Sequence, residues 1–190
     1  MTTSAPLARH HYTYDEYLAY ERASELKHEY VEGEIVAMAG GSRRHNALAA
    51  NITAVLVSTR PSGCFVFQSD QRVRVLASGL TTYPDVSMVC GPIEGDPADA
   101  SGATITNPGL IVEVLSGSTE QADRGYKWAQ YQLIPSLQEY VLVSQTEPRV
   151  EIYRRLTADT WEYHDVREGT TRLSSGATLD LATLYEGLPA

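Results

Sequence analysis

The sequence predicts a mixed α/β fold in which one β-sheet is flanked by helices. Three observations support this class. A chain of 190 residues, 43% of them hydrophobic and 21% charged, suits one domain with a sizeable core. Segments with helical hydrophobic spacing are interspersed with segments of period two. Leu110–Leu115 is almost continuously apolar, as a buried central strand is. We therefore expect residues 1–190 to form one domain, with residues 1–12 as a flexible N-terminus.

The first half of the chain predicts a helix, a hairpin and a second helix. A capping box of Thr13 and Glu16 begins the first helix, Tyr14–Ala23, because each side chain can bond the other residue's backbone N–H. His28–Met38 alternates around a Glu-Gly pair, as a β-hairpin does. Ser42 can cap the second helix, whose apolar residues recur at helical spacing. These residues are Leu48, Ile52, Val55 and Leu56.

Short strands dominate the rest of the chain. The predicted strands are Cys64–Gln68, Gln71–Leu76, Pro84–Val89, Leu110–Leu115, Gln138–Val143, Arg149–Arg154 and Trp161–Val166. A helix, Ser118–Ile134, follows the central strand and ends before Pro135. Gly91–Pro108 is rich in Gly, Pro and Asp and predicts a long surface loop. The tail adds one short strand and a terminal turn near Leu181–Tyr185.

The chain is acidic, with 24 acidic and 15 basic residues and a net charge of −9. This balance argues against a nucleic-acid coat protein or a binder of anionic membranes, but not against an enzyme with a small local site. No lysine or arginine occurs between Val75 and Asp123, so the excess is concentrated there. The acids of this stretch are Asp85, Glu94, Asp96, Asp99, Glu113, Glu120 and Asp123.

Two cysteines, Cys64 and Cys90, are too few for a disulfide-rich scaffold and lack the Cys-x-x-Cys spacing of a zinc ribbon. The N-terminal residues lack the apolar core of a signal peptide, and no apolar run approaches the length of a membrane span. The expectation is a reduced, soluble, cytoplasmic protein that does not bind membranes.

Glu113 is the most informative position, because its carboxylate lies inside an apolar strand. A buried charge is costly unless it is paired, hydrogen-bonded or bound to a metal. In strand geometry Ile111, Glu113 and Leu115 share a face. Asp85 begins another strand, and two carboxylates on adjacent strands form an oxygen-rich site suited to Mg²⁺. The alternative is a buried ion pair with an arginine and no functional role.

The helix after the central strand carries Asp123, Lys127 and Tyr131 at intervals of four, so they share one face. Lys127 either forms a weak surface ion pair with Asp123 or places an ammonium beside the metal site. In the second case it can polarise a water or stabilise transition-state charge. Both orientations of this face, toward the site and toward solvent, stay open.

Three further residues are weaker candidates. Glu29 begins the hairpin and supplies another carboxylate, and Gln71 can polarise a water at the sheet edge. His45 heads the second helix beside Arg43-Arg44, where a helix N-terminus favours anions. The alternatives are solvated, capping or half-exposed side chains. A serine hydrolase that uses Ser116 or Ser118 with His45 is a third, less supported reading, because the flanking nucleophile pattern is absent.

Several short segments, in this order, resemble the PD-(D/E)xK nuclease superfamily and, over residues 13–185, the bacterial restriction-endonuclease family known as Uma-two. The segments are His28-Glu29-Tyr30-Val31-Glu32-Gly33-Glu34, Asp70-Gln71-Arg72-Val73-Arg74-Val75, Pro84-Asp85-Val86-Ser87, Val112-Glu113-Val114-Leu115-Ser116, Asp123 with Lys127 and Tyr131, and Glu139-Tyr140-Val141-Leu142-Val143.

The resemblance implies a restriction-endonuclease-like core and Mg²⁺-dependent cleavage of DNA, with Mn²⁺ as a substitute. It assigns the metal to Asp85, Glu113 and the Val114 carbonyl, and a second metal to Glu29. The usual lysine, two residues after the glutamate, is Leu115 here, and the family pattern moves its role to Lys127. The expected phosphate contacts are Arg43, Arg44, Arg72 and Arg74.

The resemblance also implies a homodimer, and it leaves two roles for the Gly91–Pro108 loop, a substrate flap or a tolerated insertion. A different class of function stays open beside the nuclease. The overall acidity and the leucine at the usual lysine position also fit a binding or assembly module that keeps the fold without turnover.

Overall fold

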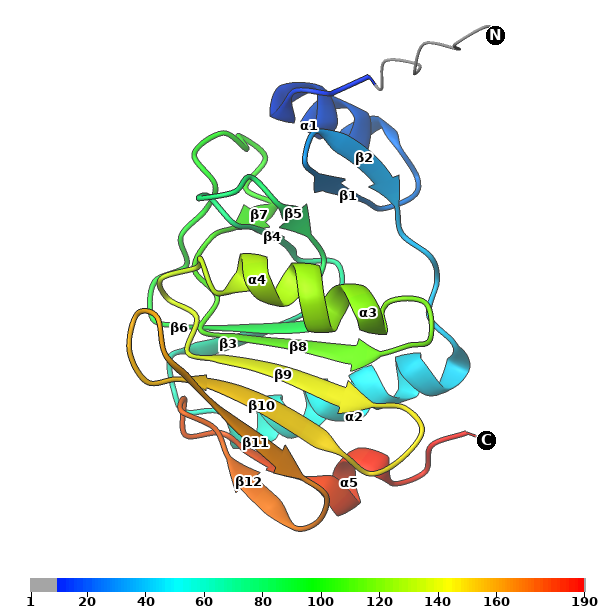
Figure 1. Ribbon diagram of the computed structural model, residues 1–190, viewed down its shortest axis with the longest axis vertical. Helices are drawn as coiled ribbons and strands as arrows, with labels where there is room; N and C mark the ends of the chain where they lie inside the picture. The colour runs from blue at the N-terminus through cyan, green and yellow to red at the C-terminus, as the bar shows by residue number, and fades with distance from the viewer. Residues whose placement is uncertain (1–9, 190) are drawn as a thin grey trace, which may run out of the picture.

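The computed structural model describes residues 10–189, so residues 1–9 of the predicted flexible N-terminus lie outside the described residues. The strands of the central sheet are β3 (Cys64–Gln68), β6 (Val86–Cys90), β8 (Leu110–Leu115), β9 (Glu139–Ser144), β10 (Val150–Arg155) and β11 (Trp161–Val166). Their order is β11-β10-β9-β8-β6-β3 (Figure 1). Neighbours are antiparallel except β8 and β9, which are parallel. The predicted strands of this sheet are confirmed with small shifts at their ends.

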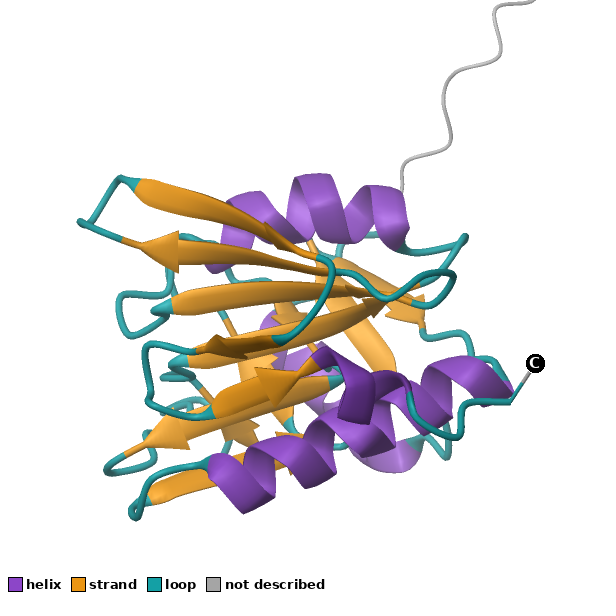
Figure 2. Ribbon diagram, turned by 90° about the horizontal axis from the view of Figure 1, so that it is seen from below, coloured by secondary structure: helices purple, strands orange, loops and turns teal. Residues whose placement is uncertain are grey.

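Helices lie on both sides of the strands (Figure 2). The helix α2 (Arg43–Thr59) packs on one face of the central sheet through the predicted apolar residues. The other face is covered by a helical run of α3 (Glu120–Ala122), a π-helical turn η1 (Asp123–Lys127) and α4 (Trp128–Tyr131). The sequence predicts this run as one regular helix, so the π turn is an addition that the pattern of apolar residues does not reveal.

The strand β8 contributes side chains to two separate cores. Val112 and Val114 pack in the core beneath α2, whereas Ile111 and Leu115 pack in the core beneath the helical run. This alternation follows from strand geometry, in which successive side chains point to opposite faces. It confirms that residue 113 shares a face with residues 111 and 115 and points toward the helical run.

A second sheet, which the single-sheet prediction misses, lies beside the helical run (Figure 1). Its strands are β1 (His28–Val31), β2 (Glu34–Ala37), β4 (Arg72–Arg74), β5 (Thr81–Thr82) and β7 (Thr104–Ile105), in the order β2-β1-β5-β4-β7. The helix α1 (Tyr14–Ala23) precedes it and has the predicted capping box. The turn at Ser69-Asp70 carries the chain from the central sheet to this one, and the predicted strand there is shortened to three residues.

The C-terminal segment forms a hairpin and a short helix. The hairpin pairs β12 (Thr170–Arg172) with β13 (Thr178–Asp180), so the tail has two strands where the sequence predicts one. The helix α5 (Leu181–Tyr185) packs its leucines into the α2 core. The Asn51 amide of α2 donates to the carbonyl of Leu184 at 3.0 Å, which ties this end of the chain to α2.

Residues 91–108, which we call the acidic loop, are anchored inside the protein. Asp96 and Asp99 are buried, and β7 pairs in parallel with β4. Arg72 donates to Asp99 at 2.8 Å, and Arg74 donates to Asp96 at 2.9 Å. Tyr14 of α1 also donates to Asp96, at 2.7 Å. The loop is exposed over much of its length, as predicted, but its two buried acids are held by partners on β4 and α1, and these contacts argue against a free substrate flap.

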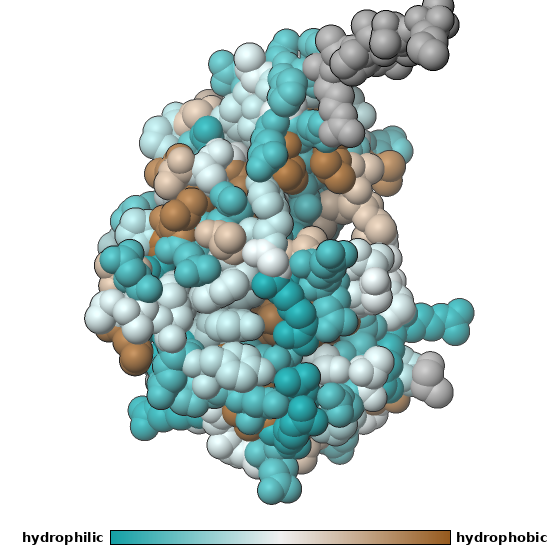
Figure 3. Space-filling view, in the orientation of Figure 1, coloured by the Kyte–Doolittle hydropathy of each residue, from teal (hydrophilic) through white to brown (hydrophobic). Residues whose placement is uncertain are grey.

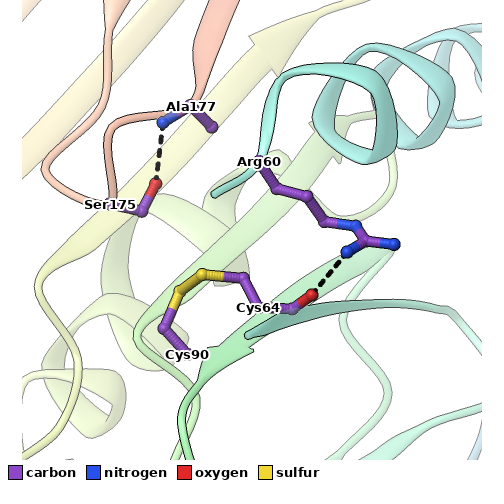
Figure 4. Close-up of a disulfide and its surroundings, with 5 residues drawn as sticks. All are labelled: Arg60, Cys64, Cys90, Ser175 and Ala177. Carbon is purple, nitrogen blue, oxygen red and sulfur yellow. Dashed lines mark hydrogen bonds between the residues drawn. A yellow bond between two sulfur atoms is a disulfide. The ribbon is translucent and has the colours of Figure 1, made fainter. Parts of the chain in front are cut away.

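The two cysteines form a disulfide (Figure 4). Cys64 of β3 and Cys90 of β6 are opposite one another in the antiparallel pair, with Cα atoms 4.0 Å apart. The flanking backbone bond from Gly91 N–H to Gly63 C=O makes this a non-hydrogen-bonded pair, the closer of the two kinds. The expectation of reduced cysteines is therefore wrong here, because strand pairing brings together residues that are 26 positions apart.

The face of the molecule that Figure 3 shows is mostly hydrophilic. Teal and white residues cover most of the face shown in Figure 3, with separate hydrophobic residues between them, as is usual for protein surfaces. Within residues 10–189, none of the helices has both the length and the apolar character that crossing a bilayer requires.

Candidate active site

Glu113 lies on β8 with its carboxylate facing the helical run. The residue is only 4% exposed. Its Oε1 accepts a hydrogen bond from the Tyr131 hydroxyl at 3.0 Å and lies 3.3 Å from the Lys127 ammonium. Its Oε2 accepts from the backbone N–H of Asp85 at 3.3 Å. The buried charge is thus met by a lysine and a tyrosine, where the alternative reading expects an arginine.

Asp85 lies immediately before β6, where the ladder between β6 and β8 has not yet begun. Its Oδ2 accepts the backbone N–H of Val114 at 2.7 Å and lies 3.1 Å from Nε2 of His45. The N–H and C=O of one strand residue point to the same side of the strand, so the Val114 carbonyl also points toward the side of Asp85. Asp85, Glu113 and Val114 are therefore brought together, as predicted.

Lys127 points into the site, which settles the orientation of its helix face. Its Nζ lies 3.3 Å from Glu113, 3.3 Å from Glu29 and 3.2 Å from Asp123. Leu115, at the position where the superfamily carries its lysine, is packed in the core. The ammonium thus reaches Glu113 from the neighbouring helix, as the resemblance implies.

The π turn explains how Asp123, Lys127 and Tyr131 all face the site. In an α-helix with 3.6 residues per turn, four residues overshoot a full turn by about 40°, so two such steps rotate by about 80°. A π turn needs more residues to complete a full turn, so the four residues from Asp123 to Lys127 fall short of a full turn instead of exceeding it. The two drifts offset each other, and the three side chains stay on one line of the helix surface.

Glu29 comes from the second sheet and completes the site from the opposite side. It lies on β1, and the Thr82 hydroxyl of β5 donates to its Oε1. The same oxygen lies 3.3 Å from the Lys127 ammonium. Glu29 therefore joins Asp85, Glu113 and Asp123 in a group of four acids that we call the carboxylate cluster.

The electrostatics of the cluster are unbalanced. Glu29, Glu113 and Asp123 surround the Lys127 ammonium, and Asp85 is paired with His45 instead. Burial raises the pKa of Glu113 to about 8, and the neighbouring acids add to this effect. Burial likewise raises the pKa of Asp123. Burial alone would lower the pKa of Lys127, but the surrounding carboxylates outweigh it and hold that pKa well above its usual value. The site therefore has more negative charge than its own residues neutralise.

Comparison with known proteins now identifies the family. A family model described as "Putative restriction endonuclease" matches residues 14–185. The chain belongs to this family. Uncharacterized protein slr1290 of Synechocystis sp. is 35% identical over 179 residues, covering 92% of this chain and 91% of its own length. Uncharacterized protein sll1609 of the same organism is 38% identical over 149 residues, covering 77% and 82%.

A solved structure supports the same fold. A crystal structure described as that of a "putative nuclease" from Anabaena variabilis ATCC 29413 matches with a TM-score of 0.72. The match covers 92% of this chain and 98% of the other, at 21% sequence identity. At this identity the likeness shows the fold alone, and it confirms the predicted mixed α/β architecture.

The donor set fits the Mg²⁺ that the restriction-endonuclease family implies. Within the described residues, no three or more His, Cys, Asp or Glu side chains are placed to form a cage that could hold a metal ion. Mg²⁺ rarely uses such a cage, because it keeps several waters and takes one or two carboxylates together with substrate phosphate. Asp85 and Glu113 offer those two carboxylates, and the uncompensated charge of the cluster favours a cation.

Other predicted residues have different places. Arg72 and Arg74 are bound to the acidic loop, so neither is available for phosphate. Arg44 donates to the carbonyls of Gln145 and Pro189 and thereby holds the C-terminal segment. Arg43 is exposed at the start of α2.

Two more predicted residues make local contacts. The Gln71 side-chain amide donates to the backbone carbonyl of Arg72 on β4 and to that of Ala103 on the acidic loop. The Ser116 hydroxyl contacts those of Ser118 and Thr119 within its own turn. These bonds stabilise the loop and the start of the helix, and none of them joins either side chain to His45 or to the carboxylate cluster.

Two supporting residues have no signal in the sequence. Thr82 orients Glu29, and the buried Tyr140 donates its hydroxyl to the backbone carbonyl of Asp123 at 3.0 Å, which holds the π turn. Tyr140 also packs against Tyr131, with ring centroids 5.3 Å apart. Tyr140 reads simply as a residue of an apolar strand, and Thr82 lies in a segment with no clear periodicity, so only the fold reveals either role.

Proposed function

We propose that this protein is a Mg²⁺-dependent endonuclease that hydrolyses phosphodiester bonds in DNA. The observation that carries the proposal is the position of Lys127, whose ammonium lies within 3.3 Å of Glu113 although it comes from a helix. A carboxylate pair with an adjacent ammonium is the minimum that this chemistry needs. Membership of the restriction-endonuclease family supports the same reaction.

In this proposal Asp85, Glu113 and the Val114 carbonyl hold Mg²⁺, with Mn²⁺ as a substitute. The bound ion supplies a Lewis acid for the scissile phosphate and lowers the pKa of a coordinated water. Glu29 is the candidate ligand for a second ion, because it faces the same lysine from the second sheet.

The side chains of the protein perform the remaining tasks. Lys127 orients the attacking water and offsets negative charge that develops on the phosphate. The Tyr131 hydroxyl fixes one oxygen of Glu113, and the backbone N–H of Asp85 fixes the other. His45 orients Asp85 through its Nε2, and the hydrogen bond to Asp85 raises the pKa of His45. These contacts hold the two carboxylates in place before substrate binds.

Incubation of the pure protein with supercoiled plasmid and Mg²⁺ or Mn²⁺ tests the reaction. We expect nicked or linear DNA with the wild type and none with Glu113→Ala or Lys127→Ala. Glu162→Gln and Arg167→Ala are matched controls, because both residues are exposed on β11 or just beyond it. Both controls should cleave like the wild type.

Cleavage that survives Glu113→Ala would overturn the assignment of the site. A folded wild type that cleaves no DNA with either metal would favour the binding or assembly module that keeps this fold without turnover. Labelling by a serine-directed fluorophosphonate, which we do not expect, would favour the serine hydrolase.

Metal binding has its own test that needs no substrate. A ligand that binds only the folded state raises its apparent stability, so Mn²⁺ should raise the Tm of the wild type. The same shift in Asp85→Ala would contradict the proposed ligands.

A homodimer and a cytoplasmic location stay predictions. Light scattering of the purified protein measures the first, and a monomer at all concentrations would contradict it. Fractionation of cells that express the native chain measures the second.

A further inference from the structure

A pocket of about 210 Å³ opens directly beside the proposed metal ligands. Asp85 and His45 form one end of it, so it adjoins the position where the scissile phosphate would lie. One wall is the face of α2 that carries Asn46, Ala49 and Ala50, and Thr53 continues this wall one turn later. Spacings of three, four and seven residues place these side chains on one helix face.

The opposite wall comes from the end of β3. Gln68 and Ser69 line it, where the chain leaves the central sheet. The lining therefore combines two alanines of α2 with the amide groups of Asn46 and Gln68 and the hydroxyl groups of Thr53 and Ser69. An amide offers two donors and an acceptor, so Asn46 and Gln68 can pair with the edge of a polar ring.

The lining offers no fixed positive charge to a phosphate. Among the lining residues, all of them in the described part of the chain, there is no lysine or arginine. His45 can carry a positive charge, but it is already engaged with Asp85. The amide and hydroxyl groups of the lining suit the polar edge of a neutral ring.

The size limits the occupant further. Ligand pockets for drug-sized molecules are commonly about 300–1,000 Å³, and this one is smaller. A pocket of this size suits one base and not a base pair. Enzymes that act on an extruded base stack it between aromatic or apolar side chains and hydrogen-bond its polar edge.

We propose that this pocket receives one unpaired nucleobase next to the bond that is cut, so that the substrate class is single-stranded or locally unpaired DNA. The inference rests on the proposed function, because it takes the scissile phosphate to lie at Asp85 and Glu113. It adds a requirement that the metal site alone does not impose, namely that the base beside the cut leaves its partner.

The test compares DNA substrates of one sequence as a single strand, a matched duplex and a duplex with one unpaired nucleotide. We expect the wild type to cleave the first and third at least about tenfold faster than the matched duplex, the size of effect that base stacking in a pocket provides. Equal rates on all three substrates would overturn the proposal.

Filling the pocket should remove this preference. Ala50 is exposed, so Ala50→Leu narrows the pocket without disturbing the core. We expect it to lower cleavage of single-stranded DNA by about tenfold or more while the stabilisation by Mn²⁺ is unchanged. Ala54→Leu is the matched control, because Ala54 is also exposed on α2 but does not line the pocket. Asn46→Leu is a second filling variant that guards against a folding defect of the first.

A binding experiment separates this inference from the proposed function. A single strand with 2-aminopurine, mixed with protein in the absence of divalent metal, should change fluorescence with the wild type and Ala54→Leu and not with Ala50→Leu. If no DNA is cleaved but this pattern holds, the nuclease proposal fails and the pocket stands. If DNA is cleaved but Ala50→Leu binds and cleaves like the wild type, the pocket proposal fails and the nuclease stands.

Discussion

The protein buries two groups of acids in opposite ways. In the acidic loop, Asp96 and Asp99 each have an arginine of their own, from β4. In the carboxylate cluster, three acids share Lys127, and the fourth, Asp85, is paired with His45. Most of these acids belong to the segment from Val75 to Asp123, which contains no lysine or arginine. Amino-acid composition alone therefore does not show which acids have a cationic partner.

The pKa values show the consequence. Burial alone would raise the pKa of Asp99, but hydrogen bonds from Ser101, Thr104 and Arg72 outweigh it and hold the pKa well below its usual value. Burial raises the pKa of Glu113 instead, and the neighbouring acids reinforce the shift against the opposing effect of Lys127. A buried acid with a matched cation stabilises the fold, whereas a group of acids without enough cation is poised to bind one.

The largest expected effect comes from breaking the matched group. Arg72→Met leaves Asp99 buried without its partner, which should lower the free energy of unfolding by about 3–5 kcal/mol. Urea denaturation measures this change. Arg43→Met, at an exposed position, should change the same quantity by less than about 0.5 kcal/mol. A loss below 1 kcal/mol for Arg72→Met would contradict the structural role of the pair.

The unmatched group should respond in the opposite manner. Glu113→Gln removes the carboxyl group whose ionisation burial and the crowded acids oppose, so the metal-free protein should keep its Tm or gain stability, while cleavage falls by about 10²–10³-fold. Thermal unfolding and plasmid cleavage measure the two quantities on the same sample. A lower Tm with unchanged cleavage would show that Glu113 stabilises the fold, as Asp99 does, and has no role in the reaction.

The two groups also predict opposite dependence on pH. Folded Glu113 keeps its proton up to about pH 8, whereas the unfolded residue releases it near its ordinary pKa of 4.5. Its contribution to stability is therefore complete below that ordinary pKa and is lost as pH rises toward 8. The pKa of Asp99 is depressed, so its contribution is present above its ordinary value of 3.8 and is lost as pH falls below it.

Thermal unfolding across this pH range, in chelator, checks the prediction. The Tm of the wild type should fall relative to Glu113→Gln as pH rises from about 5 to 8. Addition of Mn²⁺ should abolish this fall, because the ion replaces the proton as the partner of the carboxylate. Parallel curves for the two proteins would show that Glu113 titrates normally.

The smallest effect concerns the edge of the cluster. A Cβ at Gly41 would lie 2.6 Å from Nδ1 of His45, so Gly41→Ala should displace the imidazole from Asp85. We expect cleavage to fall by about tenfold, as is common when a partner of a metal ligand is disturbed. Gly40→Ala is the matched control, because a Cβ there meets nothing within 4 Å. Equal loss in both variants would point to the loop backbone instead of His45.

Local patterns predict much of this molecule. The hairpin at His28–Met38, the helix after Ser42 and the central strand are confirmed because each is specified by neighbouring residues. The face shared by Ile111, Glu113 and Leu115 is confirmed for the same reason. The approach of Asp85 and Lys127 to Glu113 follows from the family resemblance, and no local pattern requires it.

The missed features all depend on contacts between distant segments. The turn at Ser69-Asp70 looks like a hairpin, yet β3 and β4 belong to different sheets. The bond between Cys64 and Cys90 follows from strand pairing. Arg72 is of the residue type expected to contact phosphate. Only its ion pair with Asp99 shows that it holds the acidic loop instead. A sequence pattern shows which residue is charged but not which residue neutralises it.

The π turn at Asp123–Lys127 also has a consequence for how relatives are aligned. A π turn is a one-residue insertion in an α-helix, tolerated because the extra residue bulges and leaves the flanking turns intact. Homologues that lack the insertion would need the counterpart of Lys127 one position closer to the carboxylate strand to reach the same point in space. Alignments of this family should therefore allow a single-residue gap within the helix, and a motif with fixed Glu-to-Lys spacing would discard chains whose active sites superpose.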